Sequence, residues 1–315
     1  MRVLITGGTG FLGKAVARAL PGYGWSPILL APDAPTDVSD DLQDFKYVQA
    51  DVTDREGLGR VMHDARPEAI VHLAAYGEGS AGLLSSAGAD PYRAVLVNVC
   101  GFLALIECAH ASSCRKLVWS SSTTVYGPAH YYPTGVVDEE APPRPQSVYG
   151  TTKLACELLS GTIAPAEMEI TGLRLPLVYG PGRWYGGALE DLLSLARDVL
   201  SGRPSSVSVS EQPTDLLYVD DAVTSIVRTL TSTPSRRVYN VAGEQASLAQ
   251  LAREIAWHAS APAEVKPVEE AEPFPLIDGR RAFEELGLRT TVSLREGVDR
   301  WIDAERRYGL EERVT

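Results

Sequence analysis

Gly7-Gly8-Thr9-Gly10-Phe11-Leu12-Gly13 is the stretch of sequence that decides the fold. It follows the β-branched, apolar run Arg2-Val3-Leu4-Ile5-Thr6, and residues 14–20 after it carry apolar side chains at helical spacing. Glycines at 7, 10 and 13 permit a tight turn, let backbone N–H groups approach a pyrophosphate, and let the helix pack closely with its N-terminus toward the anion. The stretch therefore predicts a strand, a turn and a helix that together bind a dinucleotide.

Further short apolar runs follow at residues 27–30, 46–50, 69–73, 116–120 and 170–175, with helical sequence between most of them. Buried strands that alternate with helices predict an α/β fold, a doubly wound parallel sheet of the Rossmann type. The alternation lapses from about residue 179. We expect residues 1–178 and 214–242 to form a dinucleotide-binding domain, and residues 179–213 and 243–315 to form a smaller substrate-binding lobe.

Composition excludes several classes of protein. The 315 residues are 44% hydrophobic and 22% charged, which is ordinary for a globular protein and unlike a disordered chain or a disulfide scaffold. The net charge of −12 repels phosphate backbones and anionic lipid, so we expect neither a nucleic-acid nor a membrane partner. No uninterrupted apolar run approaches the roughly 18 residues of a membrane span, and the first residues begin a strand instead of a signal peptide.

The four cysteines and five histidines lack the spacing that a metal site requires. We therefore expect no metal, and thiols that remain reduced in the core of a cytoplasmic protein.

Two acids follow the second and third predicted strands. Asp33 stands where a carboxylate accepts from the ribose 2′-OH and repels a 2′-phosphate, and neither Lys nor Arg occurs between residues 18 and 46. This pattern favours NAD, although NADP is not excluded and Asp33 is also a candidate turn residue. Asp51, which precedes Val52, either accepts from the adenine amine or caps the following helix.

Tyr149 and Lys153 are four residues apart in an apolar-periodic segment, so both side chains lie on one helix face. We expect the ammonium to lower the phenol pKa, so that Tyr149 takes a proton from a substrate hydroxyl while a nicotinamide removes hydride. Upstream, residues 116–119 run into Ser120-Ser121-Ser122-Thr123-Thr124-Val125-Tyr126-Gly127. These hydroxyls either hold a substrate oxygen or bond only to local backbone.

In this order, the glycine turn, the serine run and the Tyr149/Lys153 pair resemble the extended short-chain dehydrogenases/reductases of the NAD-dependent epimerase/dehydratase type. His72-Leu73-Ala74-Ala75 is similar to the family's fourth-strand motif, and residues 173–181 resemble the strand that leads into its substrate lobe. The resemblance implies Ser122 as the catalytic hydroxyl, Tyr149 as the acid/base, and Thr124 as a substrate contact. Lys153 would tune the phenol and hold the nicotinamide ribose.

The same resemblance implies a cofactor site and a homodimer. The implied cofactor-binding residues are Gly7, Gly10, Phe11, Leu12, Asp33, Asp51, Val52, Leu73, Ala74, Ala75, Asn98 and Lys153. The broad apolar faces of residues 94–109 and 149–160 resemble the helices through which family members dimerise, although a core role produces the same pattern.

Departures from the family bear on the reaction. Sugar dehydratases of the family resemble one another in having Asp-Glu at the positions of Thr123 and Thr124. Some epimerases of the family have a cysteine at the position of Thr124. Dehydration and carbanion chemistry are therefore disfavoured. Hydride transfer remains, either as one-way oxidation or reduction, or as removal and return to the opposite face.

Other departures bear on the substrate. Leu177 and Thr214 replace an asparagine and an arginine that bind substrate in nucleotide-sugar members. Arg183, Arg203, Arg280 or Arg281 would have to compensate.

The segment 182–187 carries Arg183 and Trp184 between glycines, which suits either a sugar-binding loop or a flexible surface loop. Elsewhere we expect Arg174 to hold the two lobes together by an ion pair instead of contacting substrate, and Glu139 and Glu140 to lie in a solvated loop.

We predict hydride transfer with NAD, NADP not excluded, at a secondary alcohol or ketone of a sugar-like substrate. The leading candidate is a nucleotide-sugar epimerase or dehydrogenase. The alternatives are a dehydrogenase or reductase of a small non-nucleotide substrate, and a non-catalytic dinucleotide sensor.

Overall fold

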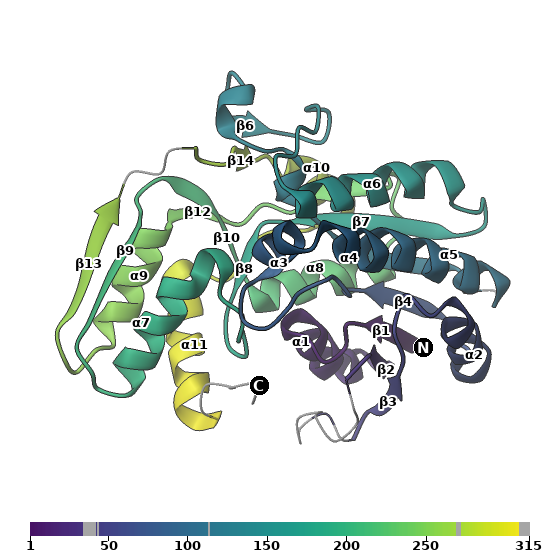
Figure 1. The fold of residues 1–315 in the computed structure, drawn as a ribbon, viewed down its shortest axis with the longest axis horizontal. Coiled ribbons are helices and arrows are strands. Elements are labelled where there is room, and N and C mark those ends of the chain that lie inside the picture. Colours follow the sequence, from purple (N-terminus) through teal and green to yellow (C-terminus); the bar gives the residue numbers. More distant parts are fainter. Residues whose placement is uncertain (34–41, 43, 113, 269–271, 309–315) are drawn as a thin grey trace.

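The computed structural model describes residues 1–33, 42, 44–112, 114–268 and 272–308 of the chain (Figure 1). Its central feature is a seven-stranded sheet of order β11-β7-β5-β4-β1-β2-β3, in which every neighbouring pair is parallel. The strands are β1 (Arg2–Thr6), β2 (Ser26–Ala31), β3 (Lys46–Gln49), β4 (Ala69–His72), β5 (Lys116–Ser122), β7 (Glu169–Leu175) and β11 (Val238–Asn240). The doubly wound α/β fold is confirmed, and its order reverses between β1 and β4, where such sheets bind ligands.

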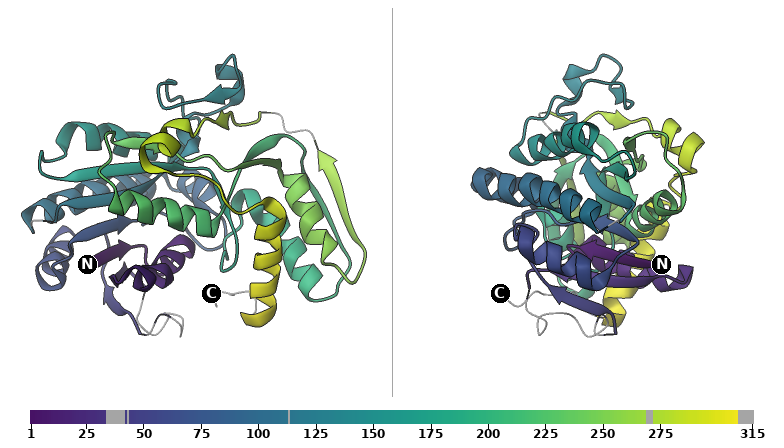
Figure 2. Two further views of the ribbon diagram at one scale, coloured as in Figure 1. Left: turned by 180° about the vertical axis from the view of Figure 1, so that it is seen from behind. Right: turned by 90° about the vertical axis from the view of Figure 1, so that its right-hand side faces the viewer.

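Helices cover both faces of this sheet (Figure 1, Figure 2). One core includes side chains of α1 (Phe11–Ala19), α8 (Val219–Thr231) and α10 (Arg280–Leu286), and the other those of α2 (Arg55–Ala65), α5 (Gly101–Ala111) and α6 (Val148–Ile163). In β1, Val3 and Ile5 belong to the first core and Leu4 to the second, and all three are fully buried. Successive strand residues point to opposite faces, so a continuous apolar run is needed to fill both cores.

A second group of strands and helices lies at the left of Figure 1. The strands β8 (Leu177–Tyr179), β10 (Pro213–Tyr218) and β12 (Glu244–Ser247) form a three-stranded sheet, and β9 (Ser205–Ser210) pairs with β13 (Ala263–Val268). The helices α7 (Glu190–Leu200), α9 (Leu248–Trp257) and α11 (Leu294–Tyr308) contribute to a separate apolar core with these strands.

Strand β10 is shared by the two cores. Leu217 belongs to the core of the central sheet, whereas Leu216 and Tyr218 belong to the core of the second group. β10 hydrogen-bonds to β8 and β12 and to no strand of the central sheet. The two halves of the molecule are therefore joined by packing across β10 as well as by the chain itself, and α1 adds Phe11 to the second core while Val16 and Ala17 belong to the first.

A small parallel pair, β6 (Val136–Val137) and β14 (Leu276–Ile277), projects at the top of Figure 1. The buried carboxylate of Asp215, on β10, anchors it: Oδ2 accepts from the Ile277 N–H at 2.9 Å, and Oδ1 accepts from the Gly243 N–H at 3.1 Å. Burial raises the pKa of Asp215 to about 6, because desolvation outweighs these two hydrogen bonds.

Residues 77–90 are rich in Gly, Ser and Ala, a composition typical of a loop, yet they contain helix α3 (Leu83–Ala89). The short 3₁₀ helices of the described residues are η1 (Leu20–Tyr23), η5 (Thr123–Val125), η6 (Ala129–Tyr131) and η7 (Gly187–Leu189).

The helix expected at residues 94–109 is longer than predicted. It runs without a break through α4 (Pro91–Val95), the π-helical segment η4 (Leu96–Cys100) and α5. By length and composition alone this run, Pro91–Ala111, is apolar enough to cross a membrane, although Asn98 and Glu107 interrupt its apolar residues. Within the protein, 44% of its apolar window is buried, and α5 contributes to the core beside the sheet.

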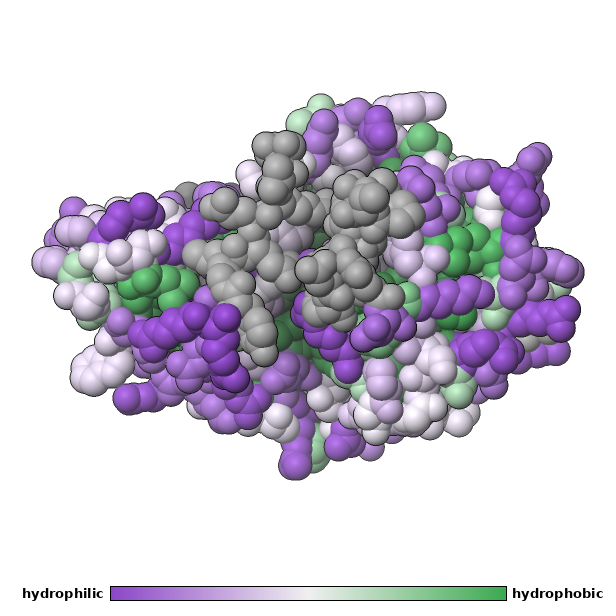
Figure 3. Space-filling model, turned by 90° about the horizontal axis from the view of Figure 1, so that it is seen from below, coloured by the Kyte–Doolittle hydropathy of each residue, from purple (hydrophilic) through white to green (hydrophobic). Residues whose placement is uncertain are grey.

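The surface seen from below is mostly hydrophilic over its described residues, with hydrophobic residues gathered into small patches (Figure 3).

Candidate active site

The glycine turn forms a cradle that no side chain could enter. Gly7 has a φ of 69°, and a Cβ on it would lie 2.8 Å from the Ala74 nitrogen. A Cβ on Gly13 would lie 2.1 Å from the Gly7 oxygen, so α1 approaches the turn only because this position is glycine. Gly10 is the N-cap of α1 and offers no side-chain cap, which leaves the first N–H groups of the helix for an anion.

A cleft of about 320 Å³ opens beside this cradle, where the strand order reverses. Of the residues predicted to bind cofactor, those that line the cleft are Gly7, Gly10, Phe11, Leu12, Asp33, Asp51, Val52, Leu73, Ala74 and Ala75. The glycine cradle and the carboxylates fit the pyrophosphate and the ribose of NAD. Sequence reasoning missed Tyr76, Leu83, Arg93 and Tyr185, which also line the cleft.

Asp33 stands just after β2, as predicted. Its Oδ2 accepts from the Thr9 hydroxyl at 2.5 Å, and its backbone oxygen accepts from the Tyr47 hydroxyl at 2.6 Å. These contacts hold the carboxylate beside the glycine turn, where an acid accepts from a ribose hydroxyl and repels a 2′-phosphate.

Asp51 lines the cleft and does not cap a helix. Its Oδ1 accepts from the backbone N–H and the hydroxyl of Thr53, both at 2.8 Å. The N-cap of α2 is Asp54, whose side chain accepts from the Gly57 N–H. Of the two roles considered for Asp51, the helix cap therefore belongs to another residue.

Asn98 lies in the π-helical segment η4 and is not among the residues that line the cleft. Its Oδ1 accepts from the Tyr76 N–H at 2.7 Å, and its Nδ2 donates to the Thr152 hydroxyl at 2.9 Å. The side chain thus connects the segment after β4 to α6, so its contacts within the chain position the wall of the cleft.

The carboxyl end of β5 faces a stripe of side chains on α6. Tyr149, Lys153 and Glu157 are spaced four residues apart and all three are buried. Lys153 Nζ donates to the Ser120 carbonyl at 2.8 Å, and Glu157 Oε1 accepts from the Ser121 hydroxyl at 2.5 Å.

The third serine of the run, Ser122, is engaged locally. Its Oγ accepts from the Thr124 hydroxyl at 2.9 Å and from the Thr124 N–H at 3.2 Å. The structure thus brings the predicted Ser122, Tyr149, Lys153 and Thr124 together at the junction of β5 and α6. Lys153 Nζ lies 5.5 Å from the centre of the Tyr149 ring.

The electrostatics of Tyr149 differ from the expectation. Burial raises the pKa of Tyr149 well above its ordinary value, with a small opposing effect from Arg183. Burial also lowers the pKa of Lys153 to about 8. The predicted lowering of the phenol pKa by Lys153 is therefore wrong for this state of the protein, because the ammonium is directed at the Ser120 carbonyl and both groups are desolvated.

Glu157 also pairs with Arg174, on β7. The guanidinium donates from Nε to Oε1 at 2.9 Å and from Nη2 to Oε2 at 2.7 Å, and each side chain is only 6% exposed. A third donor, Nη1, reaches the Tyr126 hydroxyl at 2.5 Å, and that hydroxyl contacts Asn240 Oδ1 at 2.8 Å. Arg174 does form an ion pair, but the pair ties β7 to α6 within one half of the molecule, so the expectation that it joins the two lobes is wrong.

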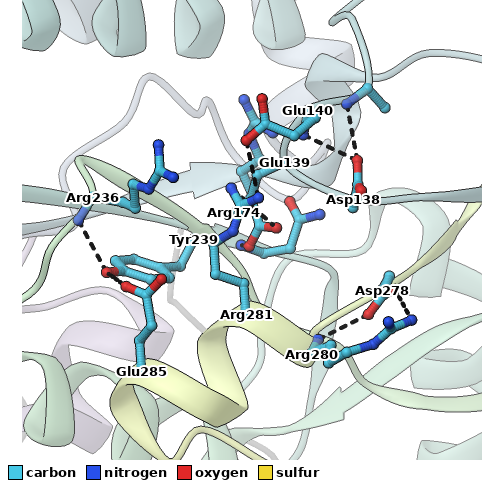
Figure 4. Close-up of polar contacts among 12 residues, drawn as sticks. Asp138, Glu139, Glu140, Arg174, Arg236, Tyr239, Asp278, Arg280, Arg281 and Glu285 are labelled. Atoms are coloured by element: carbon cyan, nitrogen blue, oxygen red, sulfur yellow. Dashed lines mark hydrogen bonds and ion pairs between the residues drawn. The ribbon is translucent and has the colours of Figure 1, made fainter.

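The polar contacts of this region continue to α10 (Figure 4). Glu139 Oε1 accepts from the Asn240 N–H at 2.8 Å, and its side chain is 6% exposed. Arg281 reaches Glu139 at 3.8 Å and Glu140 at 2.9 Å. The expectation that Glu139 lies in a solvated loop is therefore wrong, because its partners come from β11 and α10.

The loop 182–187 carries Arg183, a mostly buried residue. Its guanidinium donates to the carbonyls of Val178 at 2.7 Å, Tyr185 at 3.2 Å and Gly186 at 3.3 Å. Trp184 and Tyr185 line the cleft, and the Gly186 N–H donates to the Ser80 carbonyl at 2.9 Å. The loop is therefore built into the wall of the cleft and is not a free surface loop.

The other three arginines considered for substrate binding are engaged elsewhere. Arg203 pairs with Asp198 at 3.0 Å, and Arg280 pairs with Asp278 at 2.9 Å. Arg281 pairs with Glu139 and Glu140 as described (Figure 4). None of these three lines the cleft described above, and Arg183 itself lies behind the lining residues Phe11 and Tyr185.

His72 is buried against β1, where its Nδ1 lies 2.7 Å from the Thr6 hydroxyl, and burial lowers its pKa to about 3. Within the described ranges, no group of three or more His, Cys, Asp or Glu side chains is arranged to hold a metal ion. Cys108, Cys114 and Cys156 are buried as expected, whereas Cys100 is exposed.

The sequence and the fold of this chain were compared with those of known proteins. The model of the NAD dependent epimerase/dehydratase family matches residues 3–242. The UDP-glucose 4-epimerase of Mycolicibacterium smegmatis is 29% identical over 96% of this chain and 98% of its own length.

Two solved structures match nearly the whole fold. The UDP-glucose 4-epimerase of Thermotoga maritima with UDP-glucose has a TM-score of 0.83 and 25% identity, covering 98% of this chain and 99% of that one. The UDP-glucose 4-epimerase of Thermus thermophilus in complex with NAD has a TM-score of 0.80 and 27% identity, covering 97% of this chain and 99% of that one.

Proposed function

The chain belongs to the NAD-dependent epimerase/dehydratase family, and from this premise we propose that Ser122, Tyr149 and Lys153 assist hydride transfer between NAD and a secondary alcohol or ketone of a sugar-like substrate. It is an NAD-dependent enzyme of the extended short-chain dehydrogenase/reductase type. One observation carries the assignment of roles: α6 presents Tyr149 and Lys153 to the hydroxyl-rich end of β5. Neither side chain lines the cleft, but Tyr149 packs with Tyr76 and Leu83, which do.

In the proposed reaction Tyr149 exchanges a proton with the substrate hydroxyl, and Ser122 holds the same oxygen through its hydroxyl. Bound NAD supplies the hydride acceptor, and the positive charge of its oxidised ring favours the phenolate. Lys153 holds the nicotinamide ribose and keeps the end of β5 in place through the Ser120 carbonyl. Thr124, Arg183 and Trp184 are the proposed substrate contacts.

The cofactor and the substrate are assigned to different parts of the chain. Residues 1–178 and 214–242 are proposed to hold NAD, and residues 179–213 and 243–315 to hold the rest of the substrate. The same proposal gives Asn98 an indirect role in cofactor binding, since its contacts position the segment after β4.

The test of the catalytic roles is Tyr149→Phe. It should lower kcat by about 10²- to 10⁴-fold and leave the Kd for NAD, measured by calorimetric titration, unchanged. Tyr23→Phe, at a tyrosine 53% exposed, is the matched control and should have no effect. Full activity of Tyr149→Phe would contradict the assignment.

The leading reaction is that of a nucleotide-sugar epimerase or dehydrogenase, supported by the named relatives. Incubation with UDP-sugars and NAD distinguishes the two. An epimerase returns the hydride, so a stereoisomer accumulates without NADH, whereas a dehydrogenase forms NADH in proportion to product. A protein that only senses dinucleotide would give no turnover with any substrate.

A second candidate, a dehydrogenase or reductase of a small non-nucleotide substrate, is favoured by a specific observation. Leu177 and Thr214 offer no charged donor for a diphosphate, and Arg203, Arg280 and Arg281 are paired with acids elsewhere. A response to free sugars or hydroxy acids, with none to UDP-sugars, would select this candidate.

We also propose a cytoplasmic homodimer that uses the exposed apolar face of α4, η4 and α6. On this face Tyr92 is 80% exposed, Val95 46% and Leu158 65%. Pairing with a second copy would cover them and the apolar helix Pro91–Ala111. Leu158→Glu should give a monomer in analytical ultracentrifugation, and Trp257→Glu, at an exposed residue away from this face, should leave the mass unchanged.

A further inference from the structure

The guanidinium of Arg183 is a buried positive charge with only neutral partners. The residue is 9% exposed, and its three hydrogen bonds all go to backbone carbonyls. No carboxylate of the described residues pairs with it. An arginine has five N–H donors, so one N–H on each terminal nitrogen remains without an acceptor in the part of the chain that the structure describes.

This charge borders the space where the substrate is proposed to react. Its Cζ lies 4.3 Å from the centre of the Tyr185 ring and 5.8 Å from that of Phe11, and both rings line the cleft. Arg183 is also close enough to Tyr149 for its charge to oppose the effect of burial on the phenol. The unused donors and the catalytic phenol therefore belong to the same site.

Arg174 provides the internal comparison. It is buried to a similar degree, but the protein supplies it with a bidentate carboxylate from Glu157. A buried charge is stable when it is paired, and a guanidinium suits a carboxylate in particular because two N–H groups match its two oxygens. At Arg183 the described residues supply three backbone carbonyls and no carboxylate.

We propose that the substrate carries a carboxylate near the reacting secondary alcohol and that Arg183 binds this carboxylate. The inference rests on the proposed function, whose substrate class it narrows from sugar-like to sugar acid. Two sources share this chemistry: a sugar acid attached to a nucleotide, and a free hydroxy acid. The position of Arg183 beside Tyr149 then sets which hydroxyl reaches the phenol.

The test compares pairs of probes that differ only in a carboxylate and a hydroxymethyl group. The holoenzyme with NAD is titrated calorimetrically with UDP-glucuronate and UDP-glucose, D-glucuronate and D-glucose, and D-gluconate and D-glucitol. We expect at least one acid to bind about 10- to 100-fold more tightly than its partner, as a charge-assisted hydrogen bond allows. The responding pair identifies the source of the acid.

The variant Arg183→Gln should abolish this preference while NAD affinity and the affinity for the hydroxymethyl partner persist. Arg203→Gln, which removes an exposed arginine paired with Asp198, is the matched control and should keep the preference. If Arg183 acted only on the Tyr149 phenol, Arg183→Gln would instead shift the pH profile of kcat equally for every substrate.

A wild-type protein that binds no acid more tightly than its partner would overturn the proposal without any variant. So would an acid preference that survives Arg183→Gln. Failure of the proposed function looks different: NAD would not bind, or Tyr149→Phe would retain turnover.

Discussion

The buried pair of Arg174 and Glu157 gives a prediction whose size follows from the geometry. In Glu157→Gln the amide oxygen can still accept from the Ser121 hydroxyl, but the negative charge opposite the guanidinium is lost. The charges are about 4 Å apart, which at an effective dielectric constant of about 20 corresponds to about 4 kcal/mol. Removing one partner of a buried pair costs about 3–5 kcal/mol, so both routes give the same expectation for the free energy of unfolding.

The assay is urea unfolding followed by circular dichroism. The control is Asp198→Asn, which breaks the exposed pair with Arg203 and should change stability by less than about 1 kcal/mol. Glu157→Gln/Arg174→Met, which removes both charges, should be no less stable than Glu157→Gln alone. A loss in Glu157→Gln as small as that of the control would refute the reasoning and would mean that Tyr126 alone compensates the guanidinium.

Three further variants test other parts of the structure. Gly13→Ala would place a Cβ 2.1 Å from the Gly7 oxygen and should weaken NAD binding at least about 10-fold by calorimetry, whereas Gly59→Ala, with nothing within 4 Å, should not. The raised pKa of Asp215, about 6 against 3.8, makes the folded state bind this proton more tightly. Its stabilising effect is complete below about pH 4 and is lost as pH rises through 6, a fall of up to about 3 kcal/mol that Asp215→Asn should remove from the pH dependence of urea unfolding. Asp33→Ser should weaken NAD about 10-fold and improve NADP in parallel titrations; unchanged selectivity would show that Asp33 is only a turn residue.

Local patterns predict much of this fold because they act over short distances in the chain. The glycine turn, the strand before it and the helix after it lie within residues 2–19, and the structure has them where the sequence places them. The spacing of Tyr149 and Lys153 likewise follows from the helix alone.

Such local patterns do not predict contacts between segments that are distant in the sequence. Glu139 is hydrophilic and lies between prolines, which is typical of a solvated loop, yet its partner Asn240 is 101 residues away. The role of Glu157 could have been suspected because it continues the stripe of Tyr149 and Lys153. Its partners Ser121 and Arg174 come from two different strands, and only the folded sheet brings them together.

The pKa values of the site residues could not be predicted from the sequence either. An i,i+4 spacing predicts that a lysine and a tyrosine share a face, but it does not show how much water surrounds them. Burial raises the pKa of Tyr149, against the expectation, and it lowers the pKa of Lys153, for which the spacing made no prediction.

Strand β10 sets limits on how this protein can exchange parts with a relative. Its Leu217 packs in one core, while Leu216 and Tyr218 pack in the other. Neighbouring residues of this strand must therefore fit different halves of the molecule. A recombination joint inside residues 213–218 would mismatch both cores at once. A transplanted substrate lobe must therefore bring a version of β10 whose alternate side chains fit the recipient's sheet, and substitutions on the two faces of this strand should accumulate independently in evolution.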